Sequence, residues 1–138
     1  MRRLLFFLWP AAALLAACAG GGAPAAPAPS GPSGSLGVMT AAAGAETVAA
    51  LCDLRDATAR DAANATFFDR AHQHLHVLAA ATENVDRVPA AGVLETMQVV
   101  EADLLSDRLP AGFSDHVGAL LTSTRTALEA DGLPAPGC

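Results

Sequence analysis

Apolar residues recur along most of the chain at steps of three and four, the period of a helix with one buried face. The first such stretch extends from about Ala41 to about Ala63, and Asn64 is expected to interrupt it. Its expected buried face comprises Val48, Leu51, Cys52, Leu54, Arg55, Ala59 and Ala62. The spacing therefore predicts one long first helix.

A second helix is expected from Thr66, where Asp69 three residues later resembles a capping box. It should end near Asp86-Arg87, because the residue before Pro89 disfavours helical dihedral angles. Its expected buried face comprises Ala71, Leu75, Leu78, Thr82 and Val85.

Two further helices complete the pattern. Pro89 fits the first turn of the third helix, which should end before Pro110. Ser114 or Asp115 is a suitable N-cap for the fourth helix, and Gly132 is a suitable left-handed C-cap. The expected buried faces are Val93, Met97, Val100 and Leu104 in the third helix and Val117, Leu121, Thr124 and Leu128 in the fourth.

Amphipathic helices joined by short loops, with no alternating strand pattern between them, predict an all-α fold. We expect an antiparallel bundle of about four helices over residues 38–138. Many of the expected core positions are Ala, Thr or Val, so the core is thin and the domain should be only marginally stable.

The first residues have the features of an export signal. A short cationic start precedes an apolar run over residues 4–17, which is too short to span a bilayer. The run ends in Leu15-Ala16-Ala17-Cys18, which resembles the lipobox of bacterial lipoproteins. The resemblance implies a signal peptide over residues 1–17, cleavage before Cys18 and acylation of Cys18. An ordinary secretory signal, cut beside Ala17 or Ala19, is the alternative.

The lipobox resemblance implies a lipid-anchored chain on the extracytoplasmic side of a membrane, in the periplasm or at the cell surface. Residues 18–37 are rich in Ala, Gly, Pro and Ser and carry no charge. Such a segment has almost nothing to bury, so we expect a disordered tether that its prolines make semi-extended.

Charge and aromatic content argue against nucleic-acid partners. The formal charge of −6 becomes −8 once Arg2 and Arg3 leave with the signal, and the chain has no lysine. Nucleic-acid affinity depends on neutralising phosphates, and anionic lipid headgroups would also repel such a chain. The aromatic side chains left after the signal are Phe67, Phe68 and Phe113, too few for base stacking.

With Cys18 acylated, Cys52 and Cys138 remain as one candidate disulfide pair. Export into an oxidising compartment favours this bond, and Cys52 lies on the apolar face of the first expected helix. Two reduced thiols are the alternative.

Three alternating histidines, His72, His74 and His76, form the one cluster with chemical interest. On a helix, His72 and His76 share a face and His74 points away. Asp69 lies one turn before His72, so Asp69, His72 and His76 could offer an oxygen and two nitrogens to a transition metal such as zinc or copper. His116 is a candidate fourth ligand.

The same histidines could instead bind no metal at all. Histidines on a helix flank also occur as solvated or helix-contact residues, and Gln73 stands where the HExxH motif has its glutamate. Ser114, Asp115 and His116 are the residue types of a hydrolase triad, but adjacent positions cannot adopt triad geometry.

The sequence therefore predicts a non-enzymatic, membrane-tethered module that binds another component of the cell envelope, with a protein as the expected partner. The alternative is a transition-metal-binding lipoprotein that uses Asp69, His72 and His76. An enzyme whose site is assembled from scattered residues is a third option.

Overall fold

The computed structural model describes residues 37–138. The expected signal peptide, the lipobox with Cys18, and all of the expected tether except its last residue lie outside the described residues. Every regular element of the described part is helical: α1 (Ala41–Arg55), α2 (Arg60–Thr66), the π-helical turn η1 (Phe67–Ala71), α3 (His72–Glu83), α4 (Arg87–Leu104) and α5 (Phe113–Ala130). The predicted all-α fold class is confirmed.

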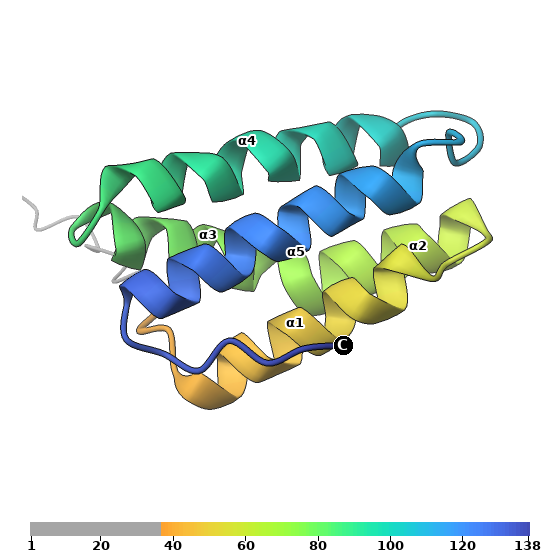
Figure 1. Ribbon diagram of the computed structural model, residues 1–138. Coiled ribbons are helices and arrows are strands. Elements are labelled where there is room, and N and C mark those ends of the chain that lie inside the picture. The colour runs from red at the N-terminus through yellow and green to blue at the C-terminus, as the bar shows by residue number, and fades with distance from the viewer. Residues whose placement is uncertain (1–36) are drawn as a thin grey trace, which may run out of the picture. The chain divides into compact units, whose positions relative to one another are not determined.

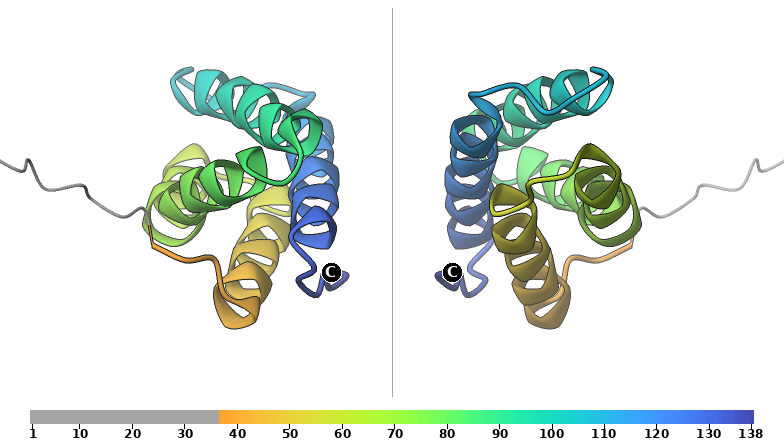
Figure 2. Two further views of the ribbon diagram at one scale, coloured as in Figure 1. Left: turned by 90° about the vertical axis from the view of Figure 1, so that its left-hand side faces the viewer. Right: turned by 90° about the vertical axis from the view of Figure 1, so that its right-hand side faces the viewer.

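Helices α2, η1 and α3 follow one another without a break, so the bundle has four helical segments. Successive segments run in alternating directions (Figure 1). Viewed along their length, each segment lies beside the next, and α1 also packs against α5 (Figure 2). The arrangement is an antiparallel bundle around one shared core.

The buried faces predicted for α4 and α5 are confirmed, because all eight of their stripe residues are buried. The α3 stripe is confirmed up to Thr82, but Val85 is 65% exposed because α3 has already ended at Glu83. The largest fully buried side chain is Phe67, which contributes to a core built mostly from Leu, Val and Ala.

The first predicted helix is wrong in its extent. Helix α1 ends at Arg55, a turn follows, and α2 begins at Arg60, so Asn64 lies inside a helix instead of interrupting one. Ala59 and Ala62 are exposed. The break coincides with Asp and Thr, which have low helix propensity, and with small residues, which have little side-chain surface to bury. Neither propensity nor packing therefore holds this segment in a helix.

The predicted start of the second helix is also wrong. Thr66 has helical dihedral angles and no side-chain capping bond, because the helix that began at Arg60 continues through it. The turn before α4 matches the sequence better. Asp86 caps α4 by accepting a hydrogen bond from the Val88 N–H at 2.9 Å, and Pro89 lies in the first turn of α4 as expected.

Helix α5 begins two or three residues earlier than predicted, at Phe113, and Gly112 precedes it without a side-chain cap. Phe113 is buried and already belongs to the helix. Ser114 therefore follows the first helical residue and is not the N-cap. The predicted C-terminal cap is confirmed at Gly132, whose φ is +70°. Hydrogen bonds from Leu133 N–H to Leu128 O and from Gly132 N–H to Glu129 O close the helix in a Schellman motif.

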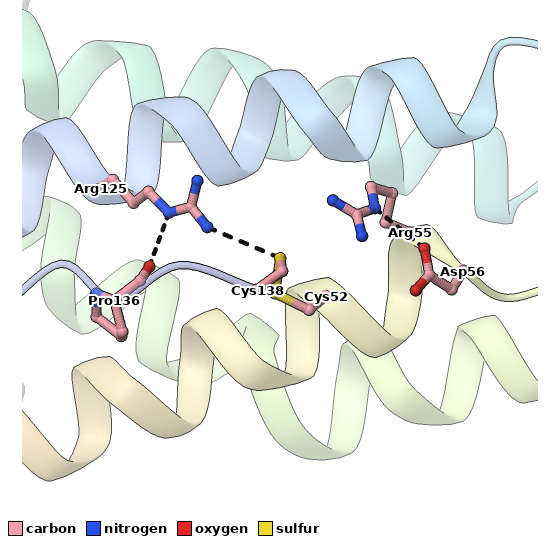
Figure 3. The surroundings of a disulfide bond; sticks show 6 residues. All are labelled: Cys52, Arg55, Asp56, Arg125, Pro136 and Cys138. Atoms are coloured by element: carbon pink, nitrogen blue, oxygen red, sulfur yellow. Dashed lines mark hydrogen bonds and ion pairs between the residues drawn. A yellow bond between two sulfur atoms is a disulfide. The ribbon is translucent and has the colours of Figure 1, made fainter.

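The C-terminal tail returns along α1 and α5 and ends in a disulfide between Cys138 and Cys52, with their Cα atoms 5.7 Å apart. Figure 3 shows Arg125 of α5 over this tail, where its Nε donates to Pro136 O at 2.9 Å. The cysteine pair predicted from the sequence is the pair that the structure brings together. It links positions 86 residues apart, so it restrains most of the bundle.

Candidate metal site

The π-helical turn η1 sets the position of His72. The His72 N–H bonds to Phe67 O, five residues back, and α3 begins at His72 in regular α-helical geometry. From there His76 follows one turn later, so both imidazoles lie on the same side of α3. Single π turns inside α-helices frequently occur at functional sites.

The two imidazoles meet a carboxylate from α4. His72 Nε2 lies 2.9 Å from Glu101 Oε1, and the rings of His72 and His76 are 4.7 Å apart, nearly perpendicular. One donor atom from each of His72, His76 and Glu101 can be chosen so that all three lie within 4.8 Å of one another. Among residues 37–138, this is the only group of three or more His, Cys, Asp or Glu side chains with donor atoms this close.

Packing restrains the group while leaving it accessible. The ring centroids of Phe67 and Phe68 lie 5.4 and 5.1 Å from that of His72, so both rings pack against this imidazole. The side chains of His72 and Glu101 remain 26% and 30% exposed, so an ion could reach them from solvent. His76 also borders a surface hollow, whose other lining residues are Gln73, Ala79, Ala80, Glu83 and Leu94.

Asp69 is not part of this group. Asp69 lies inside the wider π-helical turn η1, so it does not keep the register relative to His72 that the three-residue spacing of an α-helix predicts. Asp69 instead borders a separate hollow beside α1, together with Glu46, Arg70 and His74. Of the three ligands predicted from the sequence, the structure therefore brings together His72 and His76. Glu101 lies where Asp69 was expected.

The other chemistry-bearing candidates lie apart from the group. His116 Nδ1 lies 2.7 Å from Asp103 Oδ2, in a pair that joins the start of α5 to the end of α4. His116 is thus engaged by Asp103 and does not join His72 and His76. His74 faces away from them, as the helical period predicts, and borders the hollow beside α1.

Glu101 could have been found from the expected topology. Helices α3 and α4 form an antiparallel hairpin, in which residues about equally far from the connecting turn lie at the same level. Glu101 also directly follows Val100 of the buried stripe, which places it at the border of the core-facing side of α4. A search of the neighbouring helix at the level of His72 would have pointed to it.

The donor set suits a divalent transition metal. Two imidazoles and one carboxylate form a ligand set used for zinc with a fourth, open position, and imidazole also suits copper and nickel. Around a tetrahedral ion with bonds of about 2.0–2.1 Å, neighbouring donor atoms lie roughly 3.3 Å apart. To reach this value, the distance of 2.9 Å between His72 Nε2 and Glu101 Oε1 would have to open by a few tenths of an ångström, and donor distances that approach the limit of 4.8 Å would have to shorten.

Comparisons with protein-family models, with curated proteins and with solved structures find no match to this chain. The residues that the structure describes also include no helix that is both long and apolar enough to cross a membrane.

Proposed function

We propose that this chain is a lipid-anchored, extracytoplasmic binding domain, not an enzyme, and that its ligand is a divalent transition-metal ion held by His72, His76 and Glu101. The observation that carries the metal proposal is the convergence of three donor atoms from two helices within 4.8 Å. A protein partner in the envelope stays a prediction from the sequence.

The contacts around the three residues support binding of an ion. Both imidazoles come from a single helix at the spacing that helical metal sites use, so their separation is set before any ion arrives. The aromatic rings beside His72 limit its rotation. Preorganised ligands lose less conformational entropy on binding, which favours affinity.

Zinc and copper are the metals that this donor set favours. The described group contains no thiolate or thioether, the ligands that select Cu(I), whereas imidazole and carboxylate suit Zn(II) and Cu(II). Copper binds such ligands more tightly than zinc in the general order of divalent affinities. Without an ion, the same His72–Glu101 hydrogen bond simply joins α3 to α4.

Calorimetric titration with Zn(II), Cu(II) and Ni(II) tests the metal proposal, using protein purified through a tag that contains no histidine. We expect micromolar or tighter binding of one ion per chain. His76→Ala or Glu101→Ala should weaken binding by at least about tenfold, equivalent to roughly 1.4 kcal/mol.

His74→Ala is the matched control, because it removes a histidine from the same helix without touching the group. It should leave the affinity unchanged. Absence of binding in the wild type, or equal losses for His74→Ala and His76→Ala, would exclude a metal site at His72, His76 and Glu101.

The lipid anchor has its own test. Labelling of producing cells with radioactive palmitate should mark the wild-type chain and not Cys18→Ala, since the resemblance to a lipobox assigns the acyl chains to Cys18. Equal labelling of the two proteins would refute the anchor and leave the metal proposal standing.

A further inference from the structure

The outward side of α4 carries a regular row of exposed side chains. The row, called here the α4 outer row, comprises Val88, Ala91, Glu95, Gln98, Ala102 and Leu105, of which Leu105 is the C-cap residue and keeps helical dihedral angles. Steps of 3-4-3-4-3 separate its members, as along any single face of a helix, so they can take the a and d positions of a pair of packed helices. Val88 and Leu105 are 79% and 84% exposed, although both are apolar. The row has the spacing of a packing seam and faces solvent.

The row is complementary to itself when one copy is reversed. From either end it reads bulky apolar, small, polar, polar, small and bulky apolar. In an antiparallel helix pair, each a position faces a d position of the other helix. Val88 would then face Leu105 of a second copy, and Ala91 would face Ala102. The alanines in these layers let two helix backbones approach closely.

The polar centre selects the antiparallel direction. Glu95 would face Gln98 of the second copy, and the Gln98 amide can donate a hydrogen bond to the Glu95 carboxylate. A parallel pair would instead place Glu95 against Glu95, where two like charges repel. The reversed arrangement therefore satisfies both polar layers at the middle of the seam.

Charges at the two ends of α4 are compatible with a second, reversed copy. Asp86 and Arg87 are the N-cap and first residue of α4, Asp107 and Arg108 follow its C-terminal end, and all four residues are exposed. Reversing one copy brings each pair next to the other, so Arg87 approaches Asp107 and Asp86 approaches Arg108. These exposed ion pairs add little affinity, but they are compatible with the antiparallel arrangement, whose direction is set by the polar centre.

We propose that two copies of this chain associate through the α4 outer row as an antiparallel, two-fold symmetric dimer. One face of an 18-residue helix offers less area than the roughly 800 Å² per partner of a stable interface, so the dimer is weak in dilute solution. Attachment of both copies to one membrane raises their effective concentration and favours the dimer. The proposal does not depend on metal binding, since no member of the row belongs to the His72–His76–Glu101 group.

Cysteine cross-linking in membranes that contain the full-length chain tests the register. Ala91→Cys/Ala102→Cys should give covalent dimers with a short bismaleimide, which reacts with thiols and leaves the Cys52–Cys138 disulfide intact. Within one copy the two positions are about 16 Å apart along the helix, so a shorter linker joins them only between copies. Ala91→Cys alone and Ala102→Cys alone should give no cross-linked dimer, because each introduced thiol faces an alanine of the other copy.

Three results would overturn the dimer. The first is absence of cross-linking in the double variant, and the second is equal cross-linking in the single variants. The third is equal cross-linking in a control that pairs Ala91→Cys with Ala119→Cys, an exposed position on α5. All samples contain a metal chelator, so that a metal bridge between copies cannot produce the signal. The wild-type chain lacks both introduced cysteines, so any cross-linking in it would reveal reaction of the reagent at Cys18.

A charge change tests the polar centre in the same double-cysteine background. Gln98→Glu gathers four carboxylates at the middle of the seam and should reduce the yield of cross-linked dimer at least severalfold. Glu95→Gln should preserve it or raise it. Both side chains are exposed, so the fold should be unaffected, as circular dichroism would verify. An unchanged yield with Gln98→Glu would contradict the proposed register.

Discussion

The two long sides of the bundle differ in whether another segment of the chain covers their helices. On the side of α1 and α5, the C-terminal tail covers the helices, and Leu133 and Ala135 pack against the core. Arg125 holds the backbone of this tail, and the disulfide fixes its end (Figure 3). On the side of α3 and α4, no such cover is present among residues 37–138, and both the His72–His76–Glu101 group and the α4 outer row reach solvent.

If the proposed metal site is correct, this difference separates stability from binding. On the α1/α5 side the cysteines and Arg125 are engaged in holding the tail, so they are not free to bind a ligand. On the α3/α4 side the donor groups are held by packing but remain accessible. A change on one side should therefore alter the free energy of unfolding while sparing metal affinity, and a change on the other should do the reverse.

The largest expected effect comes from removing the disulfide. The chain-entropy estimate for a loop of 86 residues is about 4–5 kcal/mol, and measured losses in small domains are about 2–5 kcal/mol. Cys52→Ala/Cys138→Ser should therefore lower the melting temperature by about 10 °C or more, measured by circular dichroism.

Reduction of the wild-type protein is the control for that variant, since it breaks the same bond without replacing side chains. Both samples should bind Zn(II) as tightly as the oxidised protein while they remain folded. A loss of zinc affinity in folded, reduced protein would show that the two sides are coupled. It would contradict the expected separation of stability on one side from metal affinity on the other.

The next effect concerns the α3/α4 side alone. Zinc at about 100 times its dissociation constant should stabilise the fold by about 2.7 kcal/mol, because it binds the folded chain. Thermal melts with and without zinc measure this difference. Glu101→Ala should abolish most of it, and His74→Ala should retain it. Stabilisation that survives Glu101→Ala would place the ion elsewhere.

Some of this organisation could be predicted from the sequence. The stripes of α4 and α5 were predictable because burial of one face fixes the apolar spacing of a regular helix. The disulfide was predictable because the lipobox resemblance assigns Cys18 to a lipid and leaves one pair. The break between Arg55 and Arg60 was missed, since small residues continue an apparent stripe through a segment that is in fact exposed.

The metal group shows a second kind of failure. Predicting Asp69 assumed a regular helix, but η1 changes the register just before His72, and a π turn depends on packing around Phe67 that local spacing does not reveal. Glu101 comes from another helix, so only the pairing of α3 with α4 brings it to the imidazoles. Local periodicity predicted the two histidines of the proposed site, which share one helix, and could not predict its carboxylate.

A smaller effect is expected where α3 turns into α4. Asp86 accepts the Val88 N–H at 2.9 Å, and removing such an N-cap costs about 1 kcal/mol. Asp86→Ala should lower the free energy of unfolding by that amount in chemical denaturation. Metal affinity should change little, because Glu101 lies near the other end of α4. Asp86→Asn, which keeps a capping oxygen, should restore most of the stability.

The smallest effect distinguishes the start of α5 from the start of α4. Ser114 is exposed and makes no capping bond, because α5 already begins at Phe113. Ser114→Ala should therefore change the free energy of unfolding by less than about 0.5 kcal/mol, as is usual for exposed positions. A loss near 1 kcal/mol, equal to that of Asp86→Ala, would mean that Ser114 caps α5 in solution. Phe113 would then have to lie outside the helix, and its burial at the junction of α4 and α5 would need another cause.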